Sequence, residues 1–434
     1  MGADMERRIL LLQVAGLGYN FLAKSLGKAE VGGLAVTPMA GVFPALTCPV
    51  QAMMRTACPA SDHGIVGNGF FSAELWKPLF WEQSSRLMQG PRIWEDLRRR
   101  GGTVGQLFIQ QSLGPDADVV YSPAPIHKHH GGMILDSIAL PQELHARLHR
   151  ELGVFPLQSY WGPLASVRSS RWIAAATESI MAHERPNLLY SYIPHLDYAL
   201  QRHGPDSDAA RKACHQVDAI LTQLVAQSQH HGYSVIIFGD YPIMAATGTV
   251  FPNRTLRQHG WLRTRQVRQM QYPYLSGSQA FCIADHQIAH VHVWDKNAME
   301  AVKESLQTLE GVDRVLDGSA KAEAGIDYPR SGDFVLVAKR GYWFDYRWWD
   351  SPREAPDYAT HVDIHNKPGY DPCELFFGWP PMRTSQDPSR VRGTHGRLDA
   401  DEPVAFASNP GLPDHPRTLL ELARSIKALL GTIS

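Results

Sequence analysis

The stretch VFPALTCP, residues 42–49, carries an apolar run up to the hydroxyl of Thr47, with one proline before it and one after it. Residues 47–54 then have the pattern of the start of a helix. The positive end of a helix dipole favours anions and makes a nearby hydroxyl more acidic. The stretch therefore indicates either a nucleophile at Thr47 or a threonine that only caps a helix.

The segments around this stretch alternate between strand-like and helical patterns. Residues 9–14 form a continuous apolar run followed by a turn, which is typical of a fully buried parallel strand. Similar runs occupy 187–193 and 235–238, and helical patterns occupy 170–184 and 209–230. This alternation predicts an α/β fold with a mostly parallel central sheet and helices on both faces.

The 434 residues have room for one large α/β domain with insertions. We assign residues 1–380 to this domain and expect cap segments at 70–135, which is rich in Trp, Gly, Pro and His, and at 265–330, a small α+β insertion. After residue 380 Pro, Ser, Arg and Asp dominate. We therefore expect 381–434 to be a C-terminal tail with one short helix.

Composition limits the partners and the compartment. The formal net charge of -1 produces no bulk field that would recruit nucleic acid or an acidic membrane, and no apolar run is long enough to cross a bilayer. Five scattered cysteines without a CxxC pair indicate reduced thiols and a cytoplasmic location. We expect neither a nucleic acid polymer nor a membrane as partner, and the oligomeric state stays open.

A second motif, HGIVGN at 63–68, follows Thr47 and ends in Asn68. Together the two motifs resemble the nucleophile region of the nucleotide pyrophosphatase/phosphodiesterase branch of the alkaline phosphatase superfamily. This resemblance implies an alkaline-phosphatase-like fold in which Thr47 attacks phosphorus and Asn68 donates to a phosphoryl oxygen. It also implies two metal ions at the carboxyl ends of the parallel strands, where open α/β sheets place their ligands.

Three residues match metal ligands of that family: Asp197 in PHLDYALQRHGP (194–205), Asp240 in GDY (239–241), and His365 ahead of GYDP (369–372). Three other ligand positions depart from the family pattern, because they hold Ala15, Gln201 and Tyr241.

Neither metal site retains three protein ligands, the usual number for catalytic zinc. We therefore expect at most one divalent ion, zinc or manganese, with no bound ion as the alternative. If one binds, it should lie on the side of Asp197 and His365, completed by a histidine such as His286 or His195. Tyr241 should point into the pocket and hydrogen-bond either the substrate or Thr47.

Three further side chains are candidates for contact with the substrate. Gln201 occupies a family ligand position, Arg202 could hold phosphate, and Trp343 in YWFDYRWW (342–349) could stack on a base or another ring. Arg202 and Trp343 have plainer alternatives, since arginines often pair with surface carboxylates and tryptophans often pack in a core.

The favoured function is a phosphoryl-ester hydrolase or transferase, related to phosphodiesterases and nucleotide pyrophosphatases, that acts on a small phosphorylated or anionic compound. Thr47 would form a phosphothreonine intermediate. Two alternatives stay open: a biosynthetic enzyme of different, metal-independent chemistry that uses Tyr241 as acid or base, and a non-catalytic ligand-binding relative.

Overall fold

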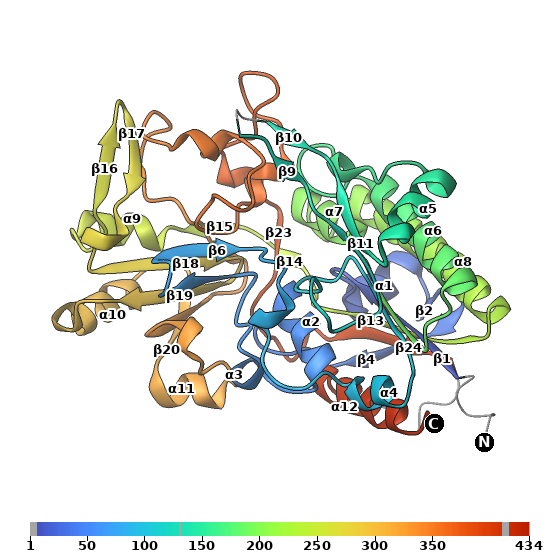
Figure 1. The fold of residues 1–434 in the computed structure, drawn as a ribbon. Coiled ribbons are helices and arrows are strands. Elements are labelled where there is room, and N and C mark those ends of the chain that lie inside the picture. The colour runs from blue at the N-terminus through green and yellow to red at the C-terminus, as the bar shows by residue number, and fades with distance from the viewer. Residues whose placement is uncertain (1–6, 130–131, 410–415, 434) are drawn as a thin grey trace.

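The computed structural model describes residues 7–129, 132–409 and 416–433. Its central feature is an eight-stranded sheet whose five inner strands, from β8 to β13, run parallel (Figure 1). Strand β1 is in the middle, with Ile9 opposite Leu188 on one side and Ser234 on the other. Strands β11, β24 and β4 join the edges in antiparallel fashion. The spatial order is β11 (Ser137–Leu140), β8 (Val119–Pro123), β7 (Val104–Leu107), β12 (Leu188–Ile193), β1 (Arg8–Val14), β13 (Tyr233–Gly239), β24 (Val404–Ser408) and β4 (Thr37–Met39).

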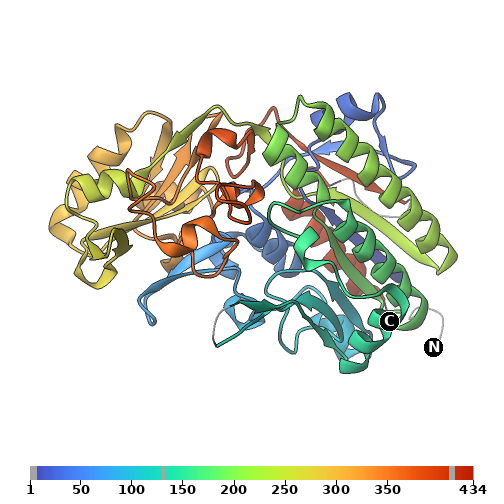
Figure 2. The same cartoon turned by 90° about the horizontal axis from the view of Figure 1, so that it is seen from above.

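Helices cover both faces of this sheet, as predicted (Figures 1 and 2). One face carries α1 (Tyr19–Leu26), α5 (Gln142–Leu152), α6 (Val167–His183) and α8 (Asp208–His230). The other carries α2 (Thr47–Thr56), α4 (Glu95–Arg99) and α12 (Leu419–Gly431). Strands β1 and β12 are buried almost throughout, because apolar side chains meet helices on each side. The predicted α/β class is therefore confirmed.

A second layer stands beside this domain, on the left in Figures 1 and 2. It is a four-stranded antiparallel sheet with its own apolar core. The strands, in spatial order, are β18 (Ala280–Asp285), β19 (Ile288–Val293), β21 (Phe334–Ala338) and β20 (Val312–Leu316). It is accompanied by α9 (Pro252–Gln258), α10 (Met299–Gln307), α11 (Gly318–Glu323) and the hairpin of β5 (Gly69–Ser72) with β6 (Lys77–Phe80).

Three predicted segments differ from the structure. Segment 70–135 is not a cap throughout, because β7 and β8 belong to the central sheet. Segment 381–434 is not a separate tail, because β24 pairs with β13 and α12 packs against α2. Strands β7, β8 and β24 have only four or five residues each. The residues of β7 and β24 include Gly, Gln, Ala or Ser, so neither of these two strands gives a long apolar run. The second sheet also extends past residue 330, to Ala338.

The remaining elements are short. They are α3 (Ala60–His63), α7 (His195–His203), β2 (Glu30–Val31), β3 (Leu34–Ala35), β9 (Ile126–His127), β10 (Met133–Ile134), β14 (Met244–Ala245), β15 (Gly248–Val250), β16 (Thr264–Val267), β17 (Met270–Pro273), β22 (Tyr342–Phe344) and β23 (Gly393–Thr394). No helix in the described part of the chain is long and apolar enough to cross a membrane. The five cysteines, all in the described part of the chain, are not paired with one another.

Candidate active site

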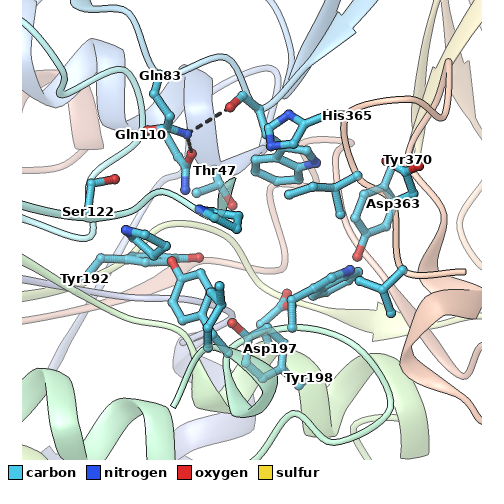
Figure 3. Close-up of a pocket in the computed structure, with 18 of the residues that line it drawn as sticks. Thr47, Gln83, Gln110, Ser122, Tyr192, Asp197, Tyr198, Asp363, His365 and Tyr370 are labelled. Carbon is cyan, nitrogen blue, oxygen red and sulfur yellow. Dashed lines mark hydrogen bonds between the residues drawn. The ribbon is translucent and has the colours of Figure 1, made fainter. Parts of the chain in front are cut away.

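One pocket of about 190 Å³ gathers most of the predicted site residues from both parts of the molecule. Thr47 comes from α2, Asp197 and Gln201 from α7, and Tyr241 from the turn after β13. His286, from the turn between β18 and β19, and His365 also line it. Figure 3 shows Thr47 between Asp197 and Tyr198 on one side and His365 and Tyr370 on the other.

Thr47 is the first residue of α2. Leu46 before it is extended, and the helix starts at the threonine, so its side chain is at the positive end of the helix. The hydroxyl is 3.0 Å from the hydroxyl of Tyr241. Tyr241 therefore points at Thr47, as expected from the sequence.

Asp197 accepts a hydrogen bond from the hydroxyl of Tyr241, at 3.3 Å. Gln201, one helical turn further along α7, donates to the other carboxylate oxygen at 2.8 Å, and the hydroxyl of Tyr370 donates to the Gln201 side-chain oxygen. Burial raises the pKa of Asp197 to about 7, against the opposing effect of its two hydrogen bonds. A carboxyl group with such a pKa can exchange protons near neutral pH.

Asp240 is fully buried at the end of β13 and does not line the pocket. Its oxygens accept from the side chain of Gln13 at 2.9 Å and from the backbone N–H groups of Gly16 and Tyr241 at 3.0 and 2.9 Å. Burial raises the pKa of Asp240 to about 8, again against its hydrogen bonds. These contacts fix the turn that presents Tyr241.

His395 was not predicted from the sequence, because it lies in the segment interpreted as a tail. Its ring stacks on Tyr241 with centroids 3.5 Å apart, and Nδ1 donates to the carbonyl oxygen of Ala45 at 2.8 Å. Nε2 is 3.8 Å from Asp197. The stack holds the tyrosine ring in place, so the C-terminal region completes the site.

Asn68 is not among the residues that line the pocket. Its side chain accepts from the backbone N–H of Cys48 at 3.0 Å and donates to Asp285 at 3.0 Å. This arrangement ties the first turn of α2 to the turn that carries His286. The predicted role of Asn68 as a donor to the substrate gains no support from this geometry.

The predicted metal residues do not form a metal site. Among the residues that the structure describes, no group of three or more His, Cys, Asp or Glu side chains is placed to hold an ion. Both oxygens of Asp240 are taken by N–H donors. His195 instead binds Gln216 and is not a pocket residue. The hydroxyl of Tyr241 lies between the candidate nucleophile and the remaining aspartate, so the residues present do not fit the implied ion.

Two predicted substrate contacts, those of Arg202 and Trp343, gain no support from the structure. The guanidinium of Arg202 donates to the backbone carbonyls of three residues, Gly162, Ala165 and Leu375. Trp343 is 2% exposed and packs in a small separate cluster. The hydrogen bonds of Arg202 and the packing of Trp343 are structural contacts between distant segments, which a local sequence pattern does not reveal.

The pocket walls are rich in aromatic side chains, and the carboxylates of Asp197 and Asp363 also line them. Six tryptophan and tyrosine side chains line it besides Tyr241: Trp81, Tyr160, Trp161, Tyr192, Tyr198 and Tyr370. None of the described residues that line it is a lysine or an arginine. Burial lowers the pKa of His286 and of His395 well below the usual range, so both rings are neutral. The polar wall consists of amides and a hydroxyl at Gln83, Gln110 and Ser122 (Figure 3).

Comparisons with known proteins agree with this architecture. Phosphonoacetate hydrolase from Sinorhizobium meliloti 1021, in complex with phosphonoformate, superposes with a TM-score of 0.59 at 15% identity, over 99% of this chain and 96% of that one. Human ectonucleotide pyrophosphatase/phosphodiesterase 5 superposes with a TM-score of 0.62 at 17% identity, over 99% of this chain and 96% of that one. The murine protein superposes with a TM-score of 0.61 at 16% identity, over 98% of this chain and 95% of that one. Residues 21–371 match the type I phosphodiesterase/nucleotide pyrophosphatase family. The match confirms the predicted phosphodiesterase type of hydrolase, and the chain belongs to this family.

Proposed function

We propose that this chain hydrolyses or transfers a phosphoryl ester through Thr47, with Tyr241 and Asp197 in the place of a metal ion. The supporting observation is the unbroken chain of hydrogen bonds from the Thr47 hydroxyl through the Tyr241 hydroxyl to the Asp197 carboxylate. A phosphoryl hydrolase needs a way to remove the proton of its nucleophile, and this chain provides one.

The first step uses that relay. The Thr47 oxygen attacks phosphorus and its proton passes to Tyr241, while the tyrosine proton passes to the Asp197 carboxylate. The bond from phosphorus to the departing oxygen breaks, and the leaving group takes the electron pair. The products are a phosphorylated Thr47, a protonated Asp197 and a free alcohol or phenol, initially as its anion. The positive end of α2 favours the charge on the reacting phosphoryl group.

The pocket favours esters of low charge. The rings of His286 and His395 are neutral, and the described lining contains no lysine or arginine, so neither of these side-chain types would compensate the charge of a dianionic phosphomonoester. A diester with one negative charge and a flat aromatic or nucleoside-like group suits the aromatic walls better. Among the structural neighbours, an inactive threonine-to-alanine variant of the murine enzyme was solved with AMP.

Bis(4-nitrophenyl) phosphate, a diester, and 4-nitrophenyl phosphate, a monoester, are the test substrates. We expect turnover of the diester to exceed that of the monoester. Thr47→Ala should abolish it, and Tyr241→Phe should lower kcat by at least about 100-fold. The matched control is Tyr233→Phe, at the other end of β13, where the hydroxyl donates only to the Pro186 carbonyl. Full activity of Thr47→Ala, or tight ligand binding without turnover, would contradict the proposal.

The unpaired cysteines suit a reducing compartment, and a cytoplasmic location is part of this proposal. Mass measurement of the native protein, with and without thiol alkylation, tests it: intact disulfides would contradict it.

A further inference from the structure

The tip of the β18–β19 hairpin reaches the active-site pocket. Asp285 ends β18 and Ile288 begins β19, with the two residues opposite each other in register. His286 in the turn between them lines the pocket. Its φ of 58° is in the left-handed region, which non-glycine residues rarely adopt. Such strain persists where the surroundings fix the residue, and it concentrates at functional sites.

Asp285 orients the ring of His286. The buried carboxylate accepts three hydrogen bonds: from the backbone N–H of Asn68 at 2.7 Å, from its side-chain amide at 3.0 Å, and from Nδ1 of His286 at 2.8 Å. Three donors favour the ionised form of a carboxyl group, although burial raises the pKa of Asp285. An ionised carboxylate can only accept, so the proton is on Nδ1 and Nε2 carries the lone pair.

Nε2 of His286 is buried and, among the described residues, has no hydrogen-bond partner. The ring itself is held on two sides, by a stack on Tyr370 with centroids 3.6 Å apart and by the ring of His395 at 3.9 Å. A buried acceptor without a partner is costly unless a ligand or water completes it. The arrangement therefore presents a fixed, neutral imidazole acceptor in the pocket wall.

This acceptor is connected to Thr47 by a second route, separate from Tyr241. Asn68 accepts from the N–H of Cys48, the residue after Thr47, and donates to Asp285. The same asparagine thus fixes the start of α2 and the carboxylate behind His286. We regard Asn68 and Asp285 as positioning residues.

We propose that His286 is a second catalytic base, which takes the proton of the acceptor that resolves the Thr47 adduct. The inference rests on the proposed function. With water as acceptor, its oxygen attacks phosphorus and one of its protons passes to Nε2 of His286. The bond from phosphorus to the Thr47 oxygen breaks, and that oxygen recovers a proton from Asp197 through Tyr241. His286 then releases its proton to solvent, and the site returns to its starting state.

Rapid mixing with bis(4-nitrophenyl) phosphate separates the two steps, because 4-nitrophenolate leaves in the first. In His286→Gln we expect a burst of about one equivalent per chain at close to the native rate, then turnover slowed by at least about 100-fold. Mass spectrometry should find the adduct on the peptide that contains Thr47. His292→Gln, a buried histidine on β19 outside the pocket lining, is the control and should show no burst.

His286→Gly is the second test, because glycine adopts a φ of 58° without strain and the variant leaves room for free imidazole. Added imidazole should speed breakdown of the accumulated adduct. With an active wild type, any of three results would overturn the inference. The first is native turnover in both variants, and the second is loss of both the burst and turnover. The third is adduct breakdown that does not respond to imidazole. A wild-type protein that neither turns over the diester nor forms an adduct overturns the proposed function and this inference together.

Discussion

Asp197 and Asp240 are two carboxylates that match family metal ligands, yet they have different surroundings. Asp240 is closed in by Gln13 and by the backbone of Gly16 and Tyr241, and no pocket surface reaches it. Asp197 faces the pocket and is contacted by Gln201 and Tyr241. The same residue type therefore has a structural role at the end of β13 and, in the proposed mechanism, a chemical role on α7.

The difference shows how one tyrosine can connect two carboxylates with the candidate nucleophile. Tyr241 uses its backbone N–H to bind Asp240 and its hydroxyl to bridge Thr47 and Asp197. One carboxylate thus positions the tyrosine, and in the proposed mechanism the other receives its proton. The roles of the two carboxylates can be tested separately by substituting one at a time.

The largest expected effect is on activity. Asp197→Asn removes the proton acceptor and should lower kcat for bis(4-nitrophenyl) phosphate by at least about 100-fold. Asp240→Asn should lower it by less than about tenfold, since Asp240 acts only through the position of Tyr241. Steady-state kinetics of both variants, with circular dichroism to confirm folding, measure this. Equal losses in the two variants would erase the distinction between the carboxylates.

The free energy of unfolding should fall more in Asp240→Asn than in Asp197→Asn, which is the opposite of the order expected for activity. Asp240→Asn places an amide N–H against the donor Gln13, so it should lower the free energy of unfolding by about 1–3 kcal/mol at about pH 6. Asp197→Asn should cost less, because its site is open to the pocket. Urea unfolding monitored by fluorescence gives both values. A more stable Asp240→Asn protein would show that the contacts around Asp240 are not what fixes the turn.

The pH dependence of stability should follow from the raised pKa values. The pKa of Asp240 is about 8 in the folded chain, against an ordinary value of 3.8. The folded protein therefore binds more protons than the unfolded chain between these pH values, so this contribution is complete below about pH 4 and is lost as the pH rises through about 8. The stability advantage of wild type over Asp240→Asn should narrow across that range. An advantage that grows with pH would mean that Asp240 is ionised in the fold.

The smallest effect concerns the pH profile of the rate. Gln201 donates to Asp197 and favours its ionised form. Gln201→Leu should therefore raise the pKa of Asp197 and move the acid limb of the kcat/KM profile upward by roughly one pH unit. Initial rates between about pH 5 and 9 check this. If the acid limb of the kcat/KM profile does not move, the titration that causes it belongs to a group other than Asp197.

The sequence predicted the parts of the site that local motifs carry. Thr47 follows an apolar run between prolines, and Asp197 and Tyr241 follow apolar strands, so their meeting at one end of a parallel sheet could be expected. His395 and Asp285 were missed as pocket-side groups because their roles depend on contacts between distant segments. Their contacts are with Ala45 and Asn68 respectively.

The same reasoning explains the predictions that failed. Arg202 lies in the motif that carries Asp197, yet its guanidinium donates to backbone carbonyls of Gly162, Ala165 and Leu375, which only the folded chain brings near. The C-terminal region is polar in composition, and β24 has only five residues. Its place beside β13 is set by tertiary pairing rather than by local propensity.

The measurement that tests the central claim most directly is diester hydrolysis before and after exhaustive chelation, with metal analysis of the same samples. If Tyr241 and Asp197 activate Thr47, the rate per chain should be unchanged after the chelator has removed divalent ions, and added zinc or manganese should not raise it. Loss of activity on chelation, with recovery in proportion to bound zinc or manganese, would contradict the account.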